Sequence, residues 1–207
     1  MMAADARLAA TAIAQAGAFT RAQATAAGFS AAQIERRIRA DAWVRVLPRV
    51  YRQAATPPSP ALRYWAAVLW AGPGCALSHA SAATIWRIPG AAIGAPEIVV
   101  HEARAPRAAG VVVHRVAYLG DPDVVRVRRL PVTSPARTIV DLAGVLGDRD
   151  LAVALTSVTS RRLVTVRAVR TRLDEIGTVG RPGTARLRAL LVALGRGGVE
   201  SSARMAG

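Results

Sequence analysis

Residues 30–52 read SAAQIERRIRADAWVRVLPRVYR, and they carry the clearest structural pattern of the N-terminal part. Ser30 is a residue type that caps helix N-termini, and the segment after it, AAQIERRIRADA, favours a helix. Beyond Ala42, the runs WVRVL and RVYRQ favour β-strands and are separated by Pro48. The stretch therefore predicts a helix that leads directly into a two-stranded wing.

Two further helices are predicted upstream of this stretch. Leu8, Ile13 and several alanines indicate a first helix that ends near Gly17. Thr20 is the predicted N-cap of a short second helix, RAQATAA, which stops at Gly28. Two short helices joined by a tight turn with glycine are typical of a helix-turn-helix. Residues 1–55 are thus predicted to form a winged helix-turn-helix domain.

The third predicted helix has one apolar face and one basic face. On a wheel of 100° per residue, Ile34 and Ile38 fall together toward the core. The residues broadly opposite are Gln33, Arg36 and Arg39, and Arg37 lies to one side. A row of small and basic side chains fits a major groove about 12 Å wide. Gln33 and Arg36 are expected to contact adenine and guanine edges, and Ser30 with the helix N-terminus to hold a phosphate.

Basic charge is concentrated in this helix and wing. Residues 36–52 contain six arginines and Asp41 as the one acid. If four to six arginines contact phosphates, the log–log salt slope of binding is about −4 to −5. The alternative is a solvated basic face that a winged helix uses for protein contacts. The candidate DNA-binding residues are Ser30, Gln33, Arg36, Arg37, Arg39, Arg45, Arg49 and Arg52.

The totals are compatible with a nucleic-acid partner but do not establish one. The chain of 207 residues has a formal net charge of +15, and all 28 basic residues are arginine. The absence of lysine is typical of a GC-rich coding bias, which weakens arginine abundance as an indication of function. The basic surplus is spread along the chain and equally suits a simply basic protein. A hydrophobic fraction of 52% excludes global disorder.

Cysteine count and hydropathy bear on the compartment. A single cysteine, Cys75, excludes a disulfide within one chain and a cysteine-rich zinc site, and is consistent with a reducing cytoplasm. The longest strongly apolar stretch, YWAAVLWAG at 64–72, is shorter than the roughly 18 residues that span a bilayer. Acid and arginine interrupt the N-terminus, so no signal peptide is evident. We therefore expect a cytoplasmic protein with no membrane partner.

The rest of the chain predicts an α/β (α+β) fold. TPPSP at 56–60 reads as a linker, followed by two helices, ALRYWAAVLWA and SHASAATIWRI. Strand-like segments at 97–102, 110–116 and 123–130, with LPV after them, predict a small mixed sheet. Apolar residues at helical spacing predict a helical C-terminal part. We expect one domain over 61–195 and a flexible tail over 196–207.

The residues that could support catalysis or bind a metal have simpler explanations. Cys75 and His79 are two possible ligands, and two do not close a zinc site. His101 and His114 are expected to be cross-strand or surface neighbours. Asp121 and Asp123 flank Pro122, and turn formation explains them. With no catalytic motif and no nucleotide-binding fingerprint, we expect no enzymatic activity, no cofactor and no metal.

Two further sets of charges have simple interpretations. Asp141, four residues after Arg137, predicts an ion pair within one helix. A second basic cluster either extends a DNA footprint, receives an acidic partner, or is a solvated helix surface. Its members are Arg161, Arg162, Arg167, Arg170 and Arg172.

The N-terminal string GAFTRAQATAAGFSAAQIERRIRADAWVRVLPRVYR resembles the winged-helix domain of AbiEi-type antitoxins of bacterial abortive-infection systems. The strings ALSHASAATIWRIPG, GVVVHR and LPVTSPARTIVDLA resemble the companion domain of actinobacterial members. The resemblance extends over about residues 5–195. It implies that the winged helix binds and represses the operon's own promoter, with double-stranded DNA as partner. It also implies that the companion domain counteracts a nucleotidyltransferase-type toxin.

Many similar actinobacterial chains continue into a nuclease domain like the very-short-patch repair endonucleases, which opens with a motif similar to VESSAR at 199–204. This chain ends just after the motif, so we expect the metal-binding carboxylates and the lysine of that nuclease to be absent. Two alternatives to the antitoxin-like autorepressor follow. One is a protein-interaction adaptor, and the other is a non-catalytic arm that delivers a separately encoded or lost nuclease to DNA. The oligomeric state stays open.

Overall fold

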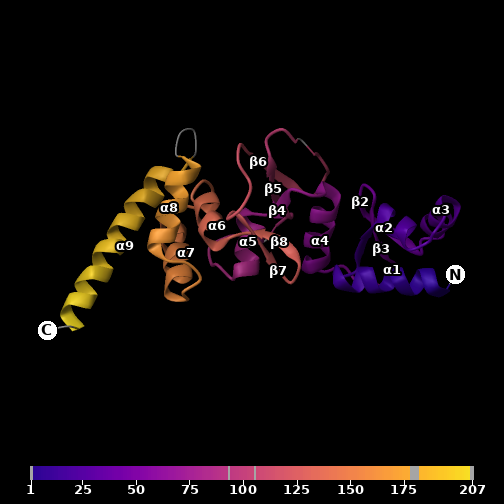
Figure 1. Cartoon of the computed structure of the whole chain (residues 1–207), viewed down its shortest axis with the longest axis horizontal. Coiled ribbons are helices and arrows are strands. Elements are labelled where there is room, and N and C mark those ends of the chain that lie inside the picture. The colour runs from indigo at the N-terminus through magenta and orange to yellow at the C-terminus, as the bar shows by residue number, and fades with distance from the viewer. Residues whose placement is uncertain (1, 93, 105, 178–181, 206–207) are drawn as a thin grey trace.

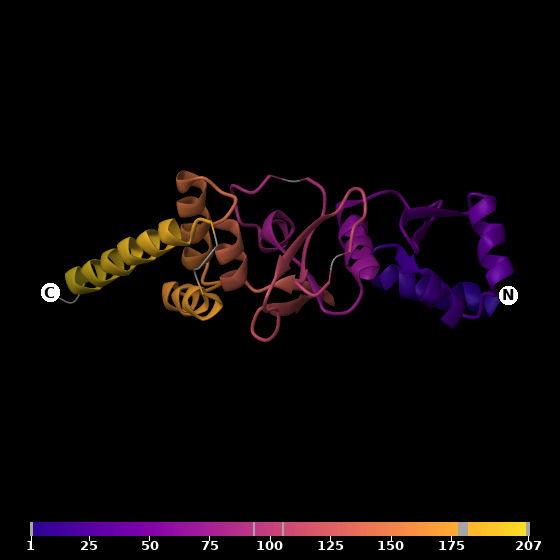
Figure 2. The same ribbon diagram turned by 90° about the horizontal axis from the view of Figure 1, so that it is seen from above.

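The chain folds into an elongated molecule with a mixed α/β architecture (Figure 1). The computed structural model describes residues 2–92, 94–104, 106–177 and 182–205, with the backbone alone for residues 2 and 196–205. The N-terminal helices and wing lie at one end, a five-stranded sheet lies in the middle, and C-terminal helices form the other end (Figures 1 and 2). The α/β fold class predicted from the sequence is confirmed.

The N-terminal part is a winged helix-turn-helix with one strand that the sequence did not reveal. Strand β1 pairs antiparallel with β3, which in turn pairs with β2, so the wing is a three-stranded sheet. Residues Ala18–Thr20 form β1 because backbone pairing to the hairpin fixes three residues that are too few to show a strand pattern. The elements are α1 (Met2–Ala14), β1 (Ala18–Thr20), α2 (Arg21–Ala26), α3 (Ala31–Arg39), β2 (Trp43–Leu47) and β3 (Val50–Gln53).

Capping and aromatic packing define this unit. Helices α2 and α3 each begin with a capping box. The hydroxyl of the cap residue accepts a hydrogen bond from the backbone N–H of a glutamine three residues later, and the side chain of that glutamine accepts one from the backbone N–H of the cap residue. Phe19 and Trp43 meet edge to face with ring centroids 4.9 Å apart, and Ile34 is fully buried beside them. Burial of this aromatic cluster holds α3 at a defined angle to the wing.

Helix α4 (Pro60–Ala71) joins the winged helix to the rest of the molecule. Ser59 caps it, with Pro60 at its first position. The short proline-rich linker does not separate two independent bodies, because Leu62 and Ala66 of α4 pack against Ala18 and Val50 of the wing sheet. The other side of α4 contacts the central sheet, so α4 belongs to both cores (Figure 1).

The central sheet has the order β6-β5-β4-β8-β7 and is mixed, as predicted. Strand β4 pairs antiparallel with β5 and parallel with β8, while β5 and β6 are parallel. Helix α5 (His79–Trp86) follows β4 directly. The strands are β4 (Cys75–Leu77), β5 (Glu97–His101), β6 (Val112–Val116), β7 (Val124–Val127) and β8 (Leu130–Thr133).

The segment 123–130, which read as one strand, contains the turn of a hairpin. Strands β7 and β8 are joined by Arg128 and Arg129, whose φ angles are 48° and 72°. A two-residue turn with both φ values positive normally carries glycine or asparagine. Because two arginines occupy it, the sequence gives no turn signal at this position.

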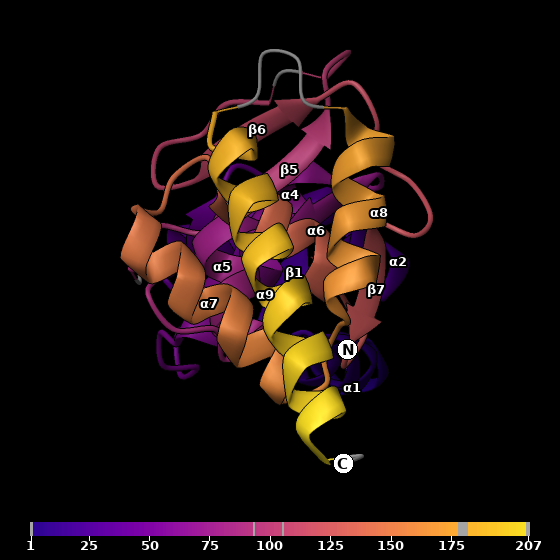
Figure 3. The same ribbon diagram turned by 90° about the vertical axis from the view of Figure 1, so that its left-hand side faces the viewer.

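Helices α6 (Pro135–Leu142), α7 (Asp148–Ser160), α8 (Val166–Ile176) and α9 (Thr184–Met205) form the C-terminal end (Figure 3). Leu151, Leu155, Leu173 and Leu187 are fully buried in their shared core. Helix α9 extends to Met205, so its backbone is helical across most of the segment 196–207 that was expected to be a tail. Helix propagation adds one hydrogen bond for each residue fixed, so it needs no core-forming pattern. Within the described residues, no helix combines the length and apolarity needed to cross a bilayer.

Candidate nucleic-acid interface

Helix α3 has a basic side exposed to solvent, as its sequence predicted. Ile34 is buried in the core, whereas Arg36 and Arg39 are exposed on the opposite side. Within the described part of the chain, neither guanidinium has an ion pair or a side-chain hydrogen bond. In Figure 1, α3 lies at the extreme N-terminal end of the molecule, away from the central sheet. These two arginines are therefore available to a ligand.

Ser30 and Gln33 are committed to capping α3. The Ser30 hydroxyl accepts a hydrogen bond from the Gln33 backbone N–H at 3.2 Å, and Gln33 Oε1 accepts one from the Ser30 N–H at 2.8 Å. A bidentate contact to adenine uses the amide oxygen of a glutamine as acceptor, and that oxygen is occupied here. The geometry thus favours phosphate binding at the helix N-terminus over base reading by Gln33.

Arg37 lies within the domain. Its Nη2 is 3.0 Å from Asp5 Oδ1 of α1, and its guanidinium carbon lies 4.7 Å from the Phe29 ring centroid and 5.5 Å from that of Trp43. Stacking on two aromatic rings and pairing with an acid anchor this side chain to α1 and the core. Arg37 therefore holds the helices together, and it is separated from the exposed row of α3.

The arginines of the wing also fall into an exposed group and a group bound within the domain. Arg45 on β2 and Arg49 in the hairpin turn are exposed, and neither has a side-chain partner among the described residues. Arg52 instead donates from Nη1 to the backbone carbonyls of Gln53, Ala54 and Thr56 at 3.1, 3.0 and 2.7 Å. It closes the turn after β3. Four arginines form the exposed set, which we call the basic face: Arg36, Arg39, Arg45 and Arg49.

One charge pair beside the basic face had no sequence signal. Arg21, the first residue of α2, donates from Nη1 to Glu35 Oε1 of α3 at 2.6 Å. The hydrogen bond to Glu35 raises the Arg21 pKa above its ordinary value. The two residues are 14 positions apart, so only the packing of α2 against α3 reveals the pair. The pair neutralises the one acid of α3.

The second basic cluster does not form a single surface. Arg172 is 6% exposed and bonds to Asp123 through Nε and Nη2, both at 2.7 Å. Its assignment to a solvated or DNA-facing cluster was wrong, because α8 turns it into the interior. Arg161 and Arg170 each donate to a backbone carbonyl, whereas Arg162 and Arg167 are exposed without a side-chain partner among the described residues.

Asp123 is the centre of a buried ionic network. Besides Arg172, it accepts from Arg137 Nη1 at 3.0 Å, and Arg137 also bonds Asp141 at 2.8 Å. The predicted Arg137–Asp141 pair is thus confirmed, but Asp123 is not explained by its turn. Burial alone lowers the Arg172 pKa, and its hydrogen bonds to Asp123 and Glu175 outweigh this effect and raise it.

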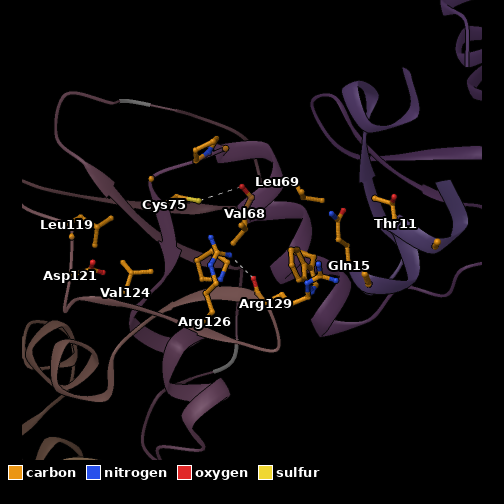
Figure 4. Close-up of a pocket in the computed structure, with 18 residues that line it drawn as sticks. Thr11, Gln15, Val68, Leu69, Cys75, Leu119, Asp121, Val124, Arg126 and Arg129 are labelled. Carbon is orange, nitrogen blue, oxygen red and sulfur yellow. Dashed lines mark hydrogen bonds between the residues drawn. The ribbon is translucent and has the colours of Figure 1, made fainter. Parts of the chain in front are cut away.

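A groove of about 910 Å³ lies where the winged helix meets the central sheet (Figure 4). Thr11 of α1 and Gln15, which follows α1, line it together with residues of α4 and the β7–β8 hairpin. Cys75 also lines it and donates from Sγ to the Val68 carbonyl at 3.6 Å. Burial raises the pKa of the Cys75 thiol to about 11. None of the four arginines of the basic face lines the groove.

Comparison with protein-family models and with curated proteins finds no match. Among solved structures, the chain is similar to the crystal structure of the RV2827C protein from Mycobacterium tuberculosis. The TM-score is 0.58 at 19% sequence identity, and the match covers 91% of this chain and 76% of that chain. At this identity the similarity concerns the fold. It extends over the winged helix, the sheet and the C-terminal helices together.

Proposed function

We propose that this protein binds double-stranded DNA through its winged helix and acts as a transcriptional regulator. The observation that carries the proposal is the basic face, where four arginines on α3 and the wing are exposed and have no side-chain partner among the described residues. A helix in the major groove with a wing on the adjacent backbone is the usual docking geometry of such domains. In this arrangement Arg36 and Arg39 contact base edges, and Arg45 and Arg49 contact phosphates.

The internal arginines support the same proposal. Arg37 and Arg52 stabilise the domain, and Arg21 neutralises Glu35, so no acidic side chain of α3 is left to repel a phosphate. A purely solvated surface would not need this separation between anchored and exposed guanidinium groups. The fully buried Ile34 keeps the basic face of α3 turned outward.

The biological role proposed is that of a cytoplasmic, non-catalytic, antitoxin-like autorepressor. It rests on the resemblance of residues 5–195 to AbiEi-type antitoxins, in which the companion domain counteracts a nucleotidyltransferase-type toxin. Two measurements test it. The protein should repress a reporter placed behind its own promoter, and it should restore growth when expressed with a nucleotidyltransferase encoded beside it. Repression without growth rescue would restrict the role to transcription.

DNA binding is tested by fluorescence anisotropy with the gene's own upstream duplex and a scrambled duplex of equal length, at two salt concentrations. The informative variant is Arg36→Ala/Arg39→Ala. Its matched control is Arg162→Ala/Arg167→Ala, which removes the same charge from exposed positions at the C-terminal end. We expect the first pair to weaken upstream binding by at least tenfold and the control pair to change it less than twofold.

Each other outcome excludes part of the proposal. Equal binding to both duplexes would indicate a basic tethering arm without sequence preference. Equal losses for the two variant pairs would show that diffuse positive charge drives binding. No binding at the lower salt concentration would reject DNA as the partner and favour a protein-interaction adaptor.

A further inference from the structure

Three side chains with metal-ligating atoms converge at the β5–β6 edge of the central sheet, far from the basic face. They are His79 at the start of α5, Glu97 at the start of β5 and His114 on β6. One ligand atom from each lies within 4.8 Å of the other two. His114 Nε2 is 2.7 Å from Glu97 Oε2, and the rings of His79 and His114 stack with centroids 3.5 Å apart.

The sheet register explains why Glu97 and His114 meet. His114 pairs with Val99 in the parallel β5–β6 ladder, and Glu97 lies two residues before Val99. Residues two apart on a strand point to the same face, so both side chains stand on one face of adjacent strands. Two hydrogen bonds fix the start of β5 to α5, from the Glu97 N–H to Ser81 Oγ and from the Ser78 N–H to the Glu97 carbonyl.

His79 reaches this face through an unusual backbone. Its φ angle is +45°, which is uncommon for a residue other than glycine although histidine adopts it more often than most, and its side chain is buried. His79 Nδ1 lies 3.0 Å from Ser78 Oγ. When Nδ1 donates this hydrogen bond, Nε2 carries the lone pair that a metal requires. A ligating histidine normally has such an outer hydrogen bond, which fixes its ring orientation.

We infer that His79, Glu97 and His114 form a binding site for a divalent transition-metal ion, with Zn²⁺ the best match. Two imidazoles and one carboxylate are a known ligand set for zinc sites that keep a fourth position open. Zinc–ligand bonds of about 2.0–2.2 Å place tetrahedral ligand atoms about 3.3–3.6 Å apart. Because the His79 and His114 rings are stacked at 17°, one ring must rotate so that both nitrogen lone pairs point at the same ion, and the His114 and Glu97 atoms, now 2.7 Å apart, must separate slightly.

The surroundings provide access to the fourth position. A cavity of about 460 Å³ adjoins the site and is lined by both histidines, by Arg115 of β6 and by Val140 and Gly144 from the α6 end. The side chains of Glu97 and His114 are 20% and 26% exposed, so an ion can reach them from solvent. A bound ion would join α5 to the edge strand β6 and leave a water on the cavity side.

The test uses the full chain without an affinity tag, treated with EDTA and then titrated with Zn²⁺ by isothermal calorimetry. We expect one ion per chain, and at least tenfold weaker binding for both His114→Ala and Glu97→Gln. The matched control is His101→Ala. His101 is an exposed histidine on the same β5, its Nδ1 accepts a hydrogen bond from the Ala103 N–H, and it lies outside the three-residue cluster. This control should bind Zn²⁺ as the unsubstituted protein does.

Two further readouts separate a built site from loss of folding or surface binding. Co²⁺ in place of Zn²⁺ should give the intense visible absorption of a four-coordinate ion, and this absorption should vanish in Glu97→Gln. Circular dichroism of the metal-free variants should match that of the unsubstituted protein. Absence of Zn²⁺ binding at about 100 µM, an octahedral Co²⁺ spectrum, or equal weakening by His101→Ala would each overturn the inference.

Discussion

Arg36 and Arg37 are neighbours in α3, yet their side chains lie in different environments. A rotation of 100° between consecutive residues leaves Arg36 exposed and turns Arg37 onto Phe29 and Trp43, where it also pairs with Asp5. The same division separates Arg49 from Arg52 in the wing. The role of an arginine in this domain thus depends on its contacts, and a count of arginines does not distinguish the exposed ones from the anchored ones.

The two neighbours should respond differently to truncation. Arg36→Ala should weaken binding to the cognate duplex by about 1–3 kcal/mol with little change in the free energy of unfolding. Arg37→Ala should lower the free energy of unfolding by about 1 kcal/mol, because a half-exposed ion pair and two cation–π contacts are lost. Urea unfolding and anisotropy on both variants check this. A loss of stability for Arg36→Ala equal to that for Arg37→Ala would contradict the division.

Cys75 should be unreactive in the folded protein. Burial raises the pKa of its thiol from 9.0 to about 11, so the thiolate fraction at pH 8 is about 100-fold below that of a free thiol. Iodoacetamide labelling at pH 8 should be at least 100-fold slower in the native protein than in urea. Between pH 9 and 11 the folded thiol keeps a proton that the unfolded one loses, so this group makes stability fall as pH rises through that window. Rapid native labelling would place Cys75 at the surface.

At the scale of elements, the Asp123 network connects parts of the chain that are distant in sequence. Asp123 precedes β7, Arg137 belongs to α6 and Arg172 to α8, so one buried carboxylate holds the sheet edge to two helices. Removal of the Asp123 carboxylate would cost much stability, because both guanidinium groups would stay buried without their shared acceptor.

Asp123→Asn should therefore lower the free energy of unfolding by about 3–5 kcal/mol, as expected for removal of one partner from a buried ionic network. Asp121→Asn is the control, because Asp121 lies in the same turn with an exposed side chain, and it should change stability by less than about 0.5 kcal/mol. Urea denaturation followed by circular dichroism measures both. Equal losses of stability for the two variants would show that Asp123 acts through the turn and not through its buried ion pairs.

The elements that the sequence revealed are those with local causes. Ser30 and Thr20 each cap a helix that begins directly after them, and apolar spacing marks the buried face of α3. Elements that depend on distant partners stayed hidden, as with β1 and β4, which have three residues each and exist through pairing in their sheets. The convergence of His79, Glu97 and His114 also depends on pairing, here between β5 and β6. The basic face was predicted only in part, because wheel and strand patterns indicate exposure but not the internal acceptors of Arg37 and Arg52.

In the molecule as a whole, the basic face and the proposed metal site lie in different regions. Helix α3 is at the N-terminal end of the elongated chain, and β5 and β6 are in its middle (Figure 1). A net charge of +15 spread over 207 residues can itself attract DNA. Local recognition must therefore be distinguished from attraction by the chain as a whole, and the dependence of affinity on salt provides this distinction.

If all four guanidinium groups of the basic face displace phosphate counterions, those at base edges included, the slope of log K against log salt should be about −3.6 for B-DNA, since each neutralised phosphate contributes about −0.9. Arg45→Ala/Arg49→Ala should flatten the slope by about 1.8, and Arg52→Ala should leave it unchanged because that guanidinium is bound to backbone carbonyls. Anisotropy titrations over a fourfold salt range resolve these values. A slope steeper than about −6 that is insensitive to the wing pair would mean that DNA lies along the basic surface of the entire chain, and the winged helix would then be one contact among several.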